Sequence, residues 1–123
     1  VSKLANQIIV GLTIGAVAEA VTLCEKVGAD PNKMIEALKG GWADSKILQT
    51  HGKRMIDKDF TPKGKTSTHL KDMNNILECA QNSNTQLPIS NLVKEMYKTL
   101  VKNGHGEEDH SSLYKEIERI NNG

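Results

Sequence analysis

The feature that most constrains this chain is a long uncharged stretch near its start. Residues 4–18 read LANQIIVGLTIGAVA and carry no charged side chain. Their apolar residues recur at helical spacing, and no convincing strand-type alternation is present. Because these residues occupy several faces, the pattern predicts a helix from about Lys3 to Val27 that is buried all round, against other helices or a partner subunit. Asn6, Gln7 and Thr13 interrupt the stretch, so we do not interpret it as a membrane span of about 20 apolar residues.

The rest of the chain continues this helical pattern and predicts an all-α multi-helix bundle. Asp30-Pro31 supplies an N-cap and a first helical residue for a second helix. Short helices are expected on either side of a break at His51-Gly52, and Thr66, Ser67 or Thr68 is expected to cap a helix reaching about Asn82. Pro88 and Ser111 or Ser112 mark the last two helix starts, the last of which is expected to turn Leu113, Ile117 and Ile120 inward. The chain of 123 residues is long enough for one domain, 1–123, with its own core.

Composition excludes several classes of function. The net charge is +1, from 16 basic and 15 acidic side chains that are well mixed, which argues against nucleic-acid or membrane-surface binding. The chain has one Trp, two Tyr and one Phe, so its core must be aliphatic. Cys24 and Cys79 fall within helical patterns and are interpreted as reduced core residues. We expect a cytoplasmic protein, and the absence of a signal-type segment before the apolar run agrees with that.

Lys3 is the first candidate for chemistry. A cation at a helix N-terminus opposes the helix dipole, which favours anions there by about 0.3–1 kcal/mol. Gln7 lies one turn further on the same face. An ammonium beside an amide suits the binding and protonation of a small oxyanion, whereas a solvated terminal lysine is the plainer alternative.

Two further polar clusters have weaker signals. In the run from His69 to Asn75, Lys71 and Asn75 share a face, and His69 and Asp72 are three residues apart, although a solvated helix face explains the same pattern. In the run from Gly104 to His110, the side chains of His105, Asp109 and His110 suit a metal ion. Loop carboxylates before serines are more typical of helix capping, so no metal site is predicted there. The turn at Gly40–Ser45 could let backbone approach a ligand, but a simple turn explains it as well. The chain contains no Ser/His/Asp-type triad and no glycine-rich phosphate loop.

Taken in order, these motifs resemble the C-terminal helical domain of the β-hydroxyacid dehydrogenase family. The resemblance covers essentially the whole chain and rests on the runs KLANQIIV at 3–10, AEA at 18–20, GADP at 28–31, GGWADS at 40–45, HGKRM at 51–55, HLKD at 69–72 and the outline of GEEDHSS at 106–112. It implies a bundle of the 6-phosphogluconate dehydrogenase C-terminal-domain type, serving substrate binding and dimerisation. It also implies an N-terminal dinucleotide-binding Rossmann domain that lies outside this chain. The chain therefore looks cut from a longer protein.

The resemblance implies roles for individual residues. Lys3 corresponds to the family's catalytic acid/base, Gln7 to the amide that holds the substrate, and Asn6 to a neighbouring position of lesser importance. Lys71 corresponds to the lysine that touches the nicotinamide cofactor, and Asp72 is expected to orient the site. The implied cofactor is NAD or NADP, bound mainly by the other domain. The implied partners are a small hydroxyacid or semialdehyde substrate and further copies of the chain, as a dimer or tetramer.

One position departs from the family pattern, and two other functions stay open. Relatives usually read Pro-Gly-Phe before the Lys-Asp helix, whereas Pro62-Lys63-Gly64 stands here, so the aromatic expected at position 64 is missing. A non-catalytic helical oligomerisation module would keep the fold without the chemistry. An imine-reducing relative fits less well, because such relatives usually lack the lysine at position 3. The chain by itself is expected to be inactive.

Overall fold

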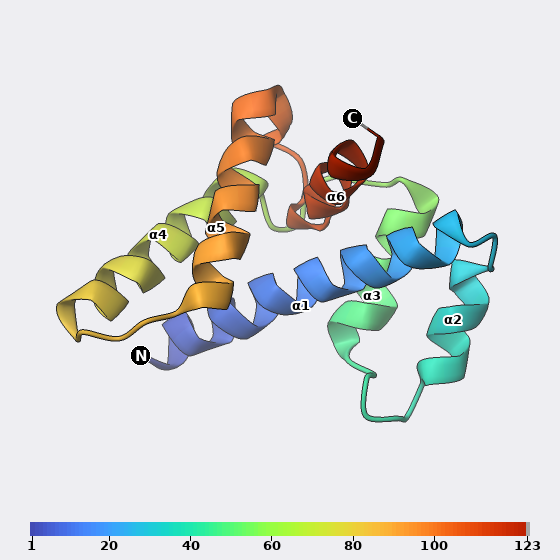
Figure 1. The fold of residues 1–123 in the computed structure, drawn as a ribbon, viewed down its shortest axis with the longest axis horizontal. Coiled ribbons are helices and arrows are strands. Elements are labelled where there is room, and N and C mark those ends of the chain that lie inside the picture. The colour runs from blue at the N-terminus through green and yellow to red at the C-terminus, as the bar shows by residue number, and fades with distance from the viewer. Residues whose placement is uncertain (123) are drawn as a thin grey trace.

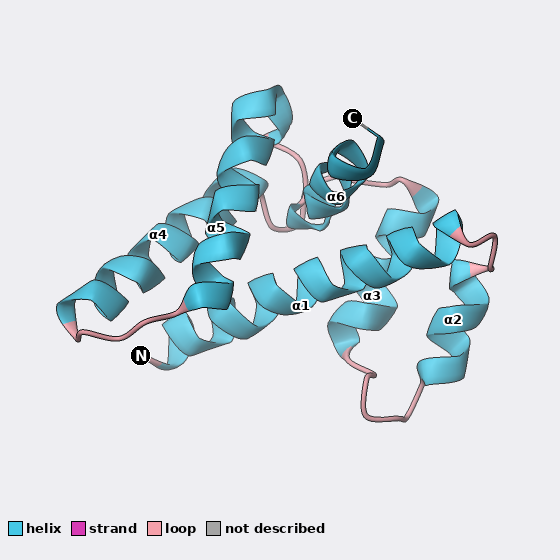
Figure 2. Cartoon of the chain, viewed as in Figure 1, coloured by secondary structure: helices cyan, strands magenta, loops and turns pink. Residues whose placement is uncertain are grey.

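The computed structural model describes residues 1–122, which form six α-helices joined by loops and two single turns (Figures 1 and 2). The elements in order are α1 (Ser2–Lys26), α2 (Pro31–Leu38), α3 (Lys46–Asp57), α4 (Thr66–Asn82), α5 (Pro88–Leu100), the π-helical turn η1 (Val101–His105), the 3₁₀ turn η2 (His110–Ser112) and α6 (Leu113–Asn122). Across residues 1–122 there is no strand, only an isolated bridge between Lys65 and Asp109. The prediction of an all-α domain is therefore confirmed.

Helix α1 is the axis on which the other helices pack. It contacts all five of them, with α2 and α3 along its C-terminal half and α4 and α5 along its N-terminal half (Figure 1). The core is aliphatic apart from two tyrosines, and its fully or nearly fully buried members include Ile14, Ala18, Val21, Met55, Met73, Ile76, Tyr97, Leu100, Leu113 and Tyr114. Burying each large aliphatic side chain contributes about 1.5–3 kcal/mol, so the packing of these residues is a main source of the stability of the bundle.

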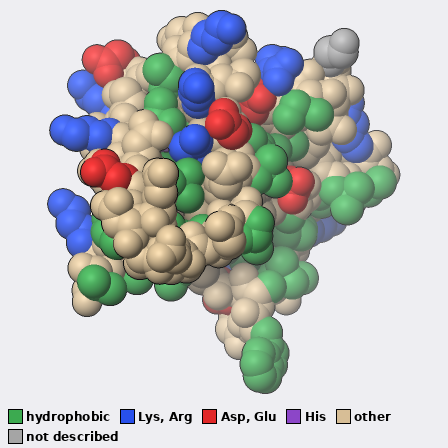
Figure 3. Space-filling view, turned by 60° about the vertical axis from the view of Figure 1, so that its left-hand side comes forward, with side chains coloured by type: hydrophobic (Ala, Val, Ile, Leu, Met, Phe, Trp, Pro, Cys, Tyr) green, Lys and Arg blue, Asp and Glu red, His purple; other side chains and the backbone are tan. Residues whose placement is uncertain are grey.

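The outer face of α1 is not covered by this chain. Ile9 is 65% exposed and Leu23 is 66% exposed. Within residues 1–122, α1 is therefore not buried on all sides, whereas the sequence predicts it to be. By length and composition alone α1 could cross a membrane, yet 44% of its most apolar window is buried against the other helices, as in the core helix of a folded domain. On the face shown in Figure 3, side chains of both charges are interspersed with hydrophobic ones, as the composition predicts.

The predicted break at His51-Gly52 is wrong. Helix α3 runs through both residues to Asp57. Gly52 is buried, and a Cβ atom there would lie 2.9 Å from Cδ1 of Ile35. The glycine therefore permits the close approach of α2 to α3 and does not end a helix.

The helix caps are partly as predicted. The Asp30 carboxylate accepts a hydrogen bond from the backbone N–H of Asn32 at 2.9 Å, as expected of an N-cap. No hydroxyl caps α4: Thr66 is its first residue, and the Thr66 hydroxyl donates to the Glu108 carbonyl at 3.0 Å. The cap of η2 is Asp109, whose carboxylate accepts from the backbone N–H of Ser111 at 3.0 Å. Aspartate carboxylates therefore cap α2 and η2, and neither Ser111 nor Ser112 acts as an N-cap.

Two predicted core residues lie at the surface. Ile120, near the end of α6, is 57% exposed. Cys79 is exposed on α4, whereas Cys24 is buried, and both thiols are free.

Candidate functional site

The candidate site begins with a contact between the first turns of α1 and the middle of α4. The side-chain N–H of Gln7 donates to Oδ2 of Asp72 at 2.8 Å, across 65 positions of sequence. Nδ2 of Asn6 donates to Oε1 of Gln7 at 3.0 Å. The Gln7 amide is therefore fixed with its oxygen toward Asn6 and its nitrogen toward Asp72. Three of the five predicted site residues meet in this contact, which we call the amide cluster (Asn6, Gln7 and Asp72).

The two predicted lysines are close to this cluster in sequence. Lys3 is exposed in the first turn of α1, which holds no acidic residue, and it precedes Gln7 by one helical turn. Lys71 is exposed on α4, next in sequence to Asp72. Across residues 1–122 neither ammonium makes a hydrogen bond or an ion pair, and both remain available to a bound anion.

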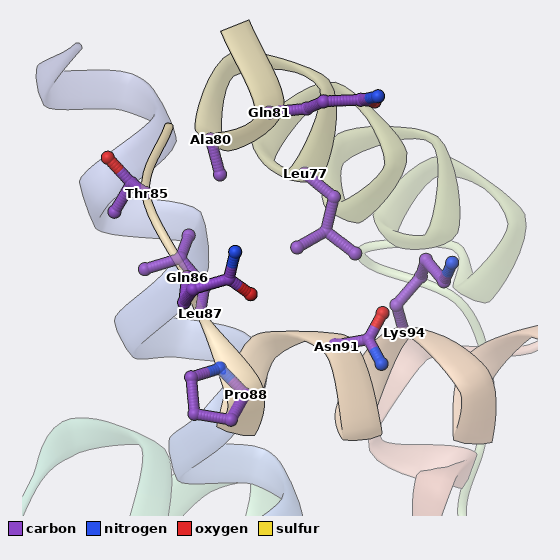
Figure 4. A pocket seen from close by; sticks show the side chains of 9 residues that line it. All are labelled: Leu77, Ala80, Gln81, Thr85, Gln86, Leu87, Pro88, Asn91 and Lys94. Atoms are coloured by element: carbon purple, nitrogen blue, oxygen red, sulfur yellow. The ribbon is translucent and has the colours of Figure 1, made fainter. Parts of the chain in front are cut away.

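The larger grooves lie elsewhere. A groove of 550 Å³ lies between the C-terminal end of α4 and the start of α5, with Leu77 and Ala80 facing Asn91 and Lys94 (Figure 4). It contains none of the predicted site residues. The candidate site is an open surface in this chain, and a second element would have to cover it to exclude water.

A chain of three histidines runs away from the amide cluster. Nε2 of His69 lies 3.3 Å from the backbone carbonyl oxygen of Gln7, and Nδ1 of His69 lies 2.8 Å from Nδ1 of His110. Nε2 of His110 lies 2.9 Å from Nε2 of His51, whose Nδ1 lies 2.9 Å from the Thr50 hydroxyl. This histidine chain (His51, His110 and His69) connects α3, η2 and α4 to α1.

Close packing holds the histidine chain. A Cβ atom at Gly11 would lie 2.9 Å from Nε2 of His69, so the glycine forms a notch in α1 for this ring. The His69 ring also stacks on the buried ring of Tyr97, with ring centroids 5.0 Å apart. Burial, together with the neighbouring imidazoles and Arg54, lowers the pKa of His110 to about 4. Burial likewise lowers the pKa of His69 and of His51.

Asp109 lies next to the His51 and His110 end of the histidine chain. It is 1% exposed, and its carboxylate accepts hydrogen bonds from the backbone N–H groups of Lys63, Gly64 and Ser111 and from the Ser111 hydroxyl. Burial raises the pKa of this carboxyl, but these hydrogen bonds outweigh it and lower the pKa to about 2. Nε of Arg54 lies 3.5 Å from Oδ2 of Asp109 and forms an ion pair without a hydrogen bond. The carboxylate is therefore saturated and ties the loop before α4 to the start of α6.

The structure separates other residues that the sequence placed together. His69 and Asp72 do not bond each other, because each reaches to α1. His105 pairs with Glu108 at 3.1 Å and stands apart from His110. The histidine chain cannot be recognised in the sequence, since its members are 18 and 41 residues apart and each belongs to a different short motif.

Comparison with known proteins supplies the context for this geometry. Residues 1–117 match the family model described as NAD-binding of NADP-dependent 3-hydroxyisobutyrate dehydrogenase. The chain is 43% identical over 120 residues to the 2-hydroxy-3-oxopropionate reductase of Escherichia coli, covering 98% of this chain and 41% of that protein. It is 32% identical to a probable 3-hydroxyisobutyrate dehydrogenase-like protein of Arabidopsis thaliana, covering 98% of this chain and 36% of that one.

A solved structure shares the fold. The crystal structure of 3-hydroxyisobutyrate dehydrogenase from Salmonella typhimurium superposes with a TM-score of 0.87 at 24% identity, over 93% of this chain and 40% of that one. The chain thus spans about two fifths of the length of the proteins that it matches.

Proposed function

This chain belongs to the β-hydroxyacid dehydrogenase family, and we propose that it is the helical substrate-side part of an NAD(P)-dependent oxidoreductase that reduces a small semialdehyde such as 2-hydroxy-3-oxopropionate. The observation that carries the proposal is the hydrogen bond between Gln7 and Asp72. It joins the Lys3 motif of α1 to the Lys71 motif of α4, and it leaves both ammonium groups free beside an oriented amide.

The roles of the side chains follow from their chemistry. A nicotinamide cofactor, when bound, supplies the hydride that reaches the carbonyl carbon of the substrate. Lys3 donates a proton to the carbonyl oxygen as negative charge develops there, and accepts it back in the oxidative direction. Gln7 has one N–H engaged by Asp72, so its second N–H is free to hold a substrate oxygen in place. Asn6 acts by holding the Gln7 amide in that orientation.

The residues of α4 serve the cofactor side of the site in this proposal. Lys71 offers an exposed ammonium that suits contact with the polar groups around a nicotinamide, and Asp72 positions Gln7. Most of the dinucleotide would be held by a separate domain of the complete enzyme, which also makes the choice between NAD and NADP.

A second candidate function rests on the surface of α1. Its exposed apolar residues, with Ile89 and Leu92 of α5, suit association with a second copy of the chain, as expected of a homo-oligomer. A purely structural module of this fold would keep that surface and lose the chemistry of Lys3. The two candidates are separated by activity, because only the first requires turnover.

The test is Lys3→Arg in the complete enzyme. Arginine keeps the positive charge but does not release its proton, so turnover should fall by about 10²- to 10⁴-fold while the cofactor still binds. Lys33→Arg is the matched control, because Lys33 is an exposed lysine on α2, remote in sequence from the amide cluster. Turnover near wild type in Lys3→Arg would reject Lys3 as the acid.

The substrate is identified by assaying a panel of semialdehydes with both reduced cofactors. We expect one small semialdehyde carrying a carboxylate to be reduced far faster than its uncharged analogues, because Lys3 and Lys71 both favour an anion. Equal rates for charged and uncharged aldehydes would contradict that assignment.

A further inference from the structure

We propose that His51 and His110 together bind a divalent transition-metal ion through their Nε2 atoms, at a site separate from the amide cluster. The two nitrogens come from α3 and η2 and lie 2.9 Å apart. One ring nitrogen of each histidine and a carboxylate oxygen of Asp109 all lie within 4.8 Å of one another. This proposal does not depend on the proposed reductase activity.

The separation of the two nitrogens matches a particular coordination geometry. Imidazole nitrogens bind such metals at about 2.0–2.1 Å, and two of them at a right angle on one ion lie about 2.9 Å apart. Right angles belong to square-planar and tetragonal sites, which Cu²⁺ and Ni²⁺ prefer. The imidazole pair is therefore spaced for Cu²⁺ or Ni²⁺ rather than for a tetrahedral ion.

The hydrogen bonds around the pair leave the lone pair of His110 free. The Gln7 carbonyl is only an acceptor, so the hydrogen of a neutral His69 sits on its Nε2. Nδ1 of His69 must then accept from Nδ1 of His110. His110 consequently presents a bare Nε2 toward His51.

His51 can carry its ring hydrogen on Nδ1 or on Nε2, and the orientation of the Thr50 hydroxyl determines which nitrogen carries it. The Thr50 hydroxyl lies 2.9 Å from Nδ1 of His51 and 2.8 Å from the Lys46 carbonyl oxygen, and its single hydrogen serves one of them. With that hydrogen on the Lys46 carbonyl, Nδ1 of His51 donates to Thr50 and Nε2 of His51 is bare as well. Metal binding then requires only that the His51 hydrogen move from Nε2 to Nδ1. Both ligands keep a hydrogen-bonded outer partner, as metal-bound histidines almost always do.

The surroundings admit an ion. His51 is only half-buried, so the pair is reachable from solvent. Gly64 has no side chain, and a Cβ atom there would lie 3.2 Å from both Nε2 and Cε1 of His110. Asp109 and Arg54 offset each other in charge, and the saturated Asp109 carboxylate remains a neighbour of the ion. Water would complete the coordination.

The experiment is titration of the full chain with Cu²⁺ alone, followed by calorimetry and electron paramagnetic resonance. We expect one ion per chain, a tetragonal spectrum with hyperfine coupling from two nitrogens, and a higher melting temperature, because the ion binds only the folded state. His51→Asn should weaken binding by more than the roughly 10- to 100-fold that loss of an outer-shell partner costs. His105→Asn is the matched control and should bind as wild type, since His105 pairs with Glu108.

A second variant guards against misfolding of the first. Gly64→Ala keeps all histidines and crowds the His110 ring around Nε2, so it should also weaken Cu²⁺ binding while the circular dichroism spectrum stays unchanged. Absence of a bound ion in wild type would overturn the proposal. So would binding that survives both His51→Asn and Gly64→Ala at wild-type affinity.

Discussion

The amide cluster and the histidine chain meet at Gln7 but are built differently. The amide cluster lies at an open surface, and its three residues come from two motifs, each contiguous in sequence. The histidine chain lies deeper, and each of its rings comes from a different element. Two glycines and a tyrosine shape its surroundings.

This difference suggests that the two regions do different work. The amide cluster offers hydrogen bonds to a substrate, whereas packing fixes the rings of the histidine chain in place. Side chains beside the amide cluster have free donors, which suits a site that must accept and release a molecule. Groups in and around the histidine chain are paired: burial lowers the pKa of His110, and hydrogen bonds lower the pKa of Asp109. Removing a residue should therefore affect activity at the first region and stability at the second.

The largest effect on stability is expected from the loss of Asp109, which lies next to the histidine chain. Asp109→Ala leaves Arg54 without its carboxylate partner and several backbone N–H groups without an acceptor, so the free energy of unfolding should fall by about 3–5 kcal/mol. Urea denaturation measures this. Asp57→Ala is the control, because its surface pair with Lys53 should contribute about 0–1 kcal/mol. Equal losses in the two variants would remove the distinction between the regions.

Changes at the amide cluster should affect catalysis first. In Asp72→Asn of the complete enzyme, Gln7 loses a charged acceptor worth about 1.5–3 kcal/mol, so kcat/KM should fall by roughly 10- to 100-fold. Steady-state kinetics with the identified semialdehyde provide the measurement. Glu78→Gln, an exposed carboxylate on the same helix, should leave kcat/KM unchanged. A loss of stability without a loss of kcat/KM would mean that Asp72 is only structural.

The contact between the two regions can be tested through Gly11. Gly11→Ala places a methyl group 2.9 Å from Nε2 of His69, and this overpacking should cost about 1–3 kcal/mol. Gly15→Ala in the same helix meets nothing closer than 3.7 Å and should stabilise α1 by up to about 1 kcal/mol. Thermal denaturation of the pair gives the sign of each change, and stabilisation by both would show that His69 does not fill the notch.

The smallest effect is expected from the titration of His51. Burial holds the pKa of His51 below its ordinary value of 6.5, so the unfolded chain takes up the proton first. In the presence of a chelator, wild type should lose stability relative to His51→Asn as the pH falls through 6.5. Because His51 is half-exposed, the difference should be small. Parallel stability curves from pH 7.5 to pH 5 would contradict the burial of this ring.

Much of the fold and part of the site could be predicted from the sequence, for physical reasons that particular residues illustrate. The helical spacing of α1 and the Asp30-Pro31 cap are local signals, and both predict the observed elements. Gly52 does not end α3, although a glycine that ends a helix and one that admits a neighbour, as Gly52 admits Ile35, look alike in sequence. His51, His69 and His110 could not be grouped, since only the packing of α3, α4 and η2 brings their rings together.

The central claim is that the Lys3 amine donates the proton to the substrate oxygen, and chemical rescue tests it most directly. Lys3→Ala in the complete enzyme removes the amine one helical turn before Gln7. We predict that this variant is nearly inactive and that added methylammonium restores semialdehyde reduction in a saturable way, with no effect on wild type. A Lys3→Ala enzyme that turns over at the wild-type rate, without added amine, would contradict the account.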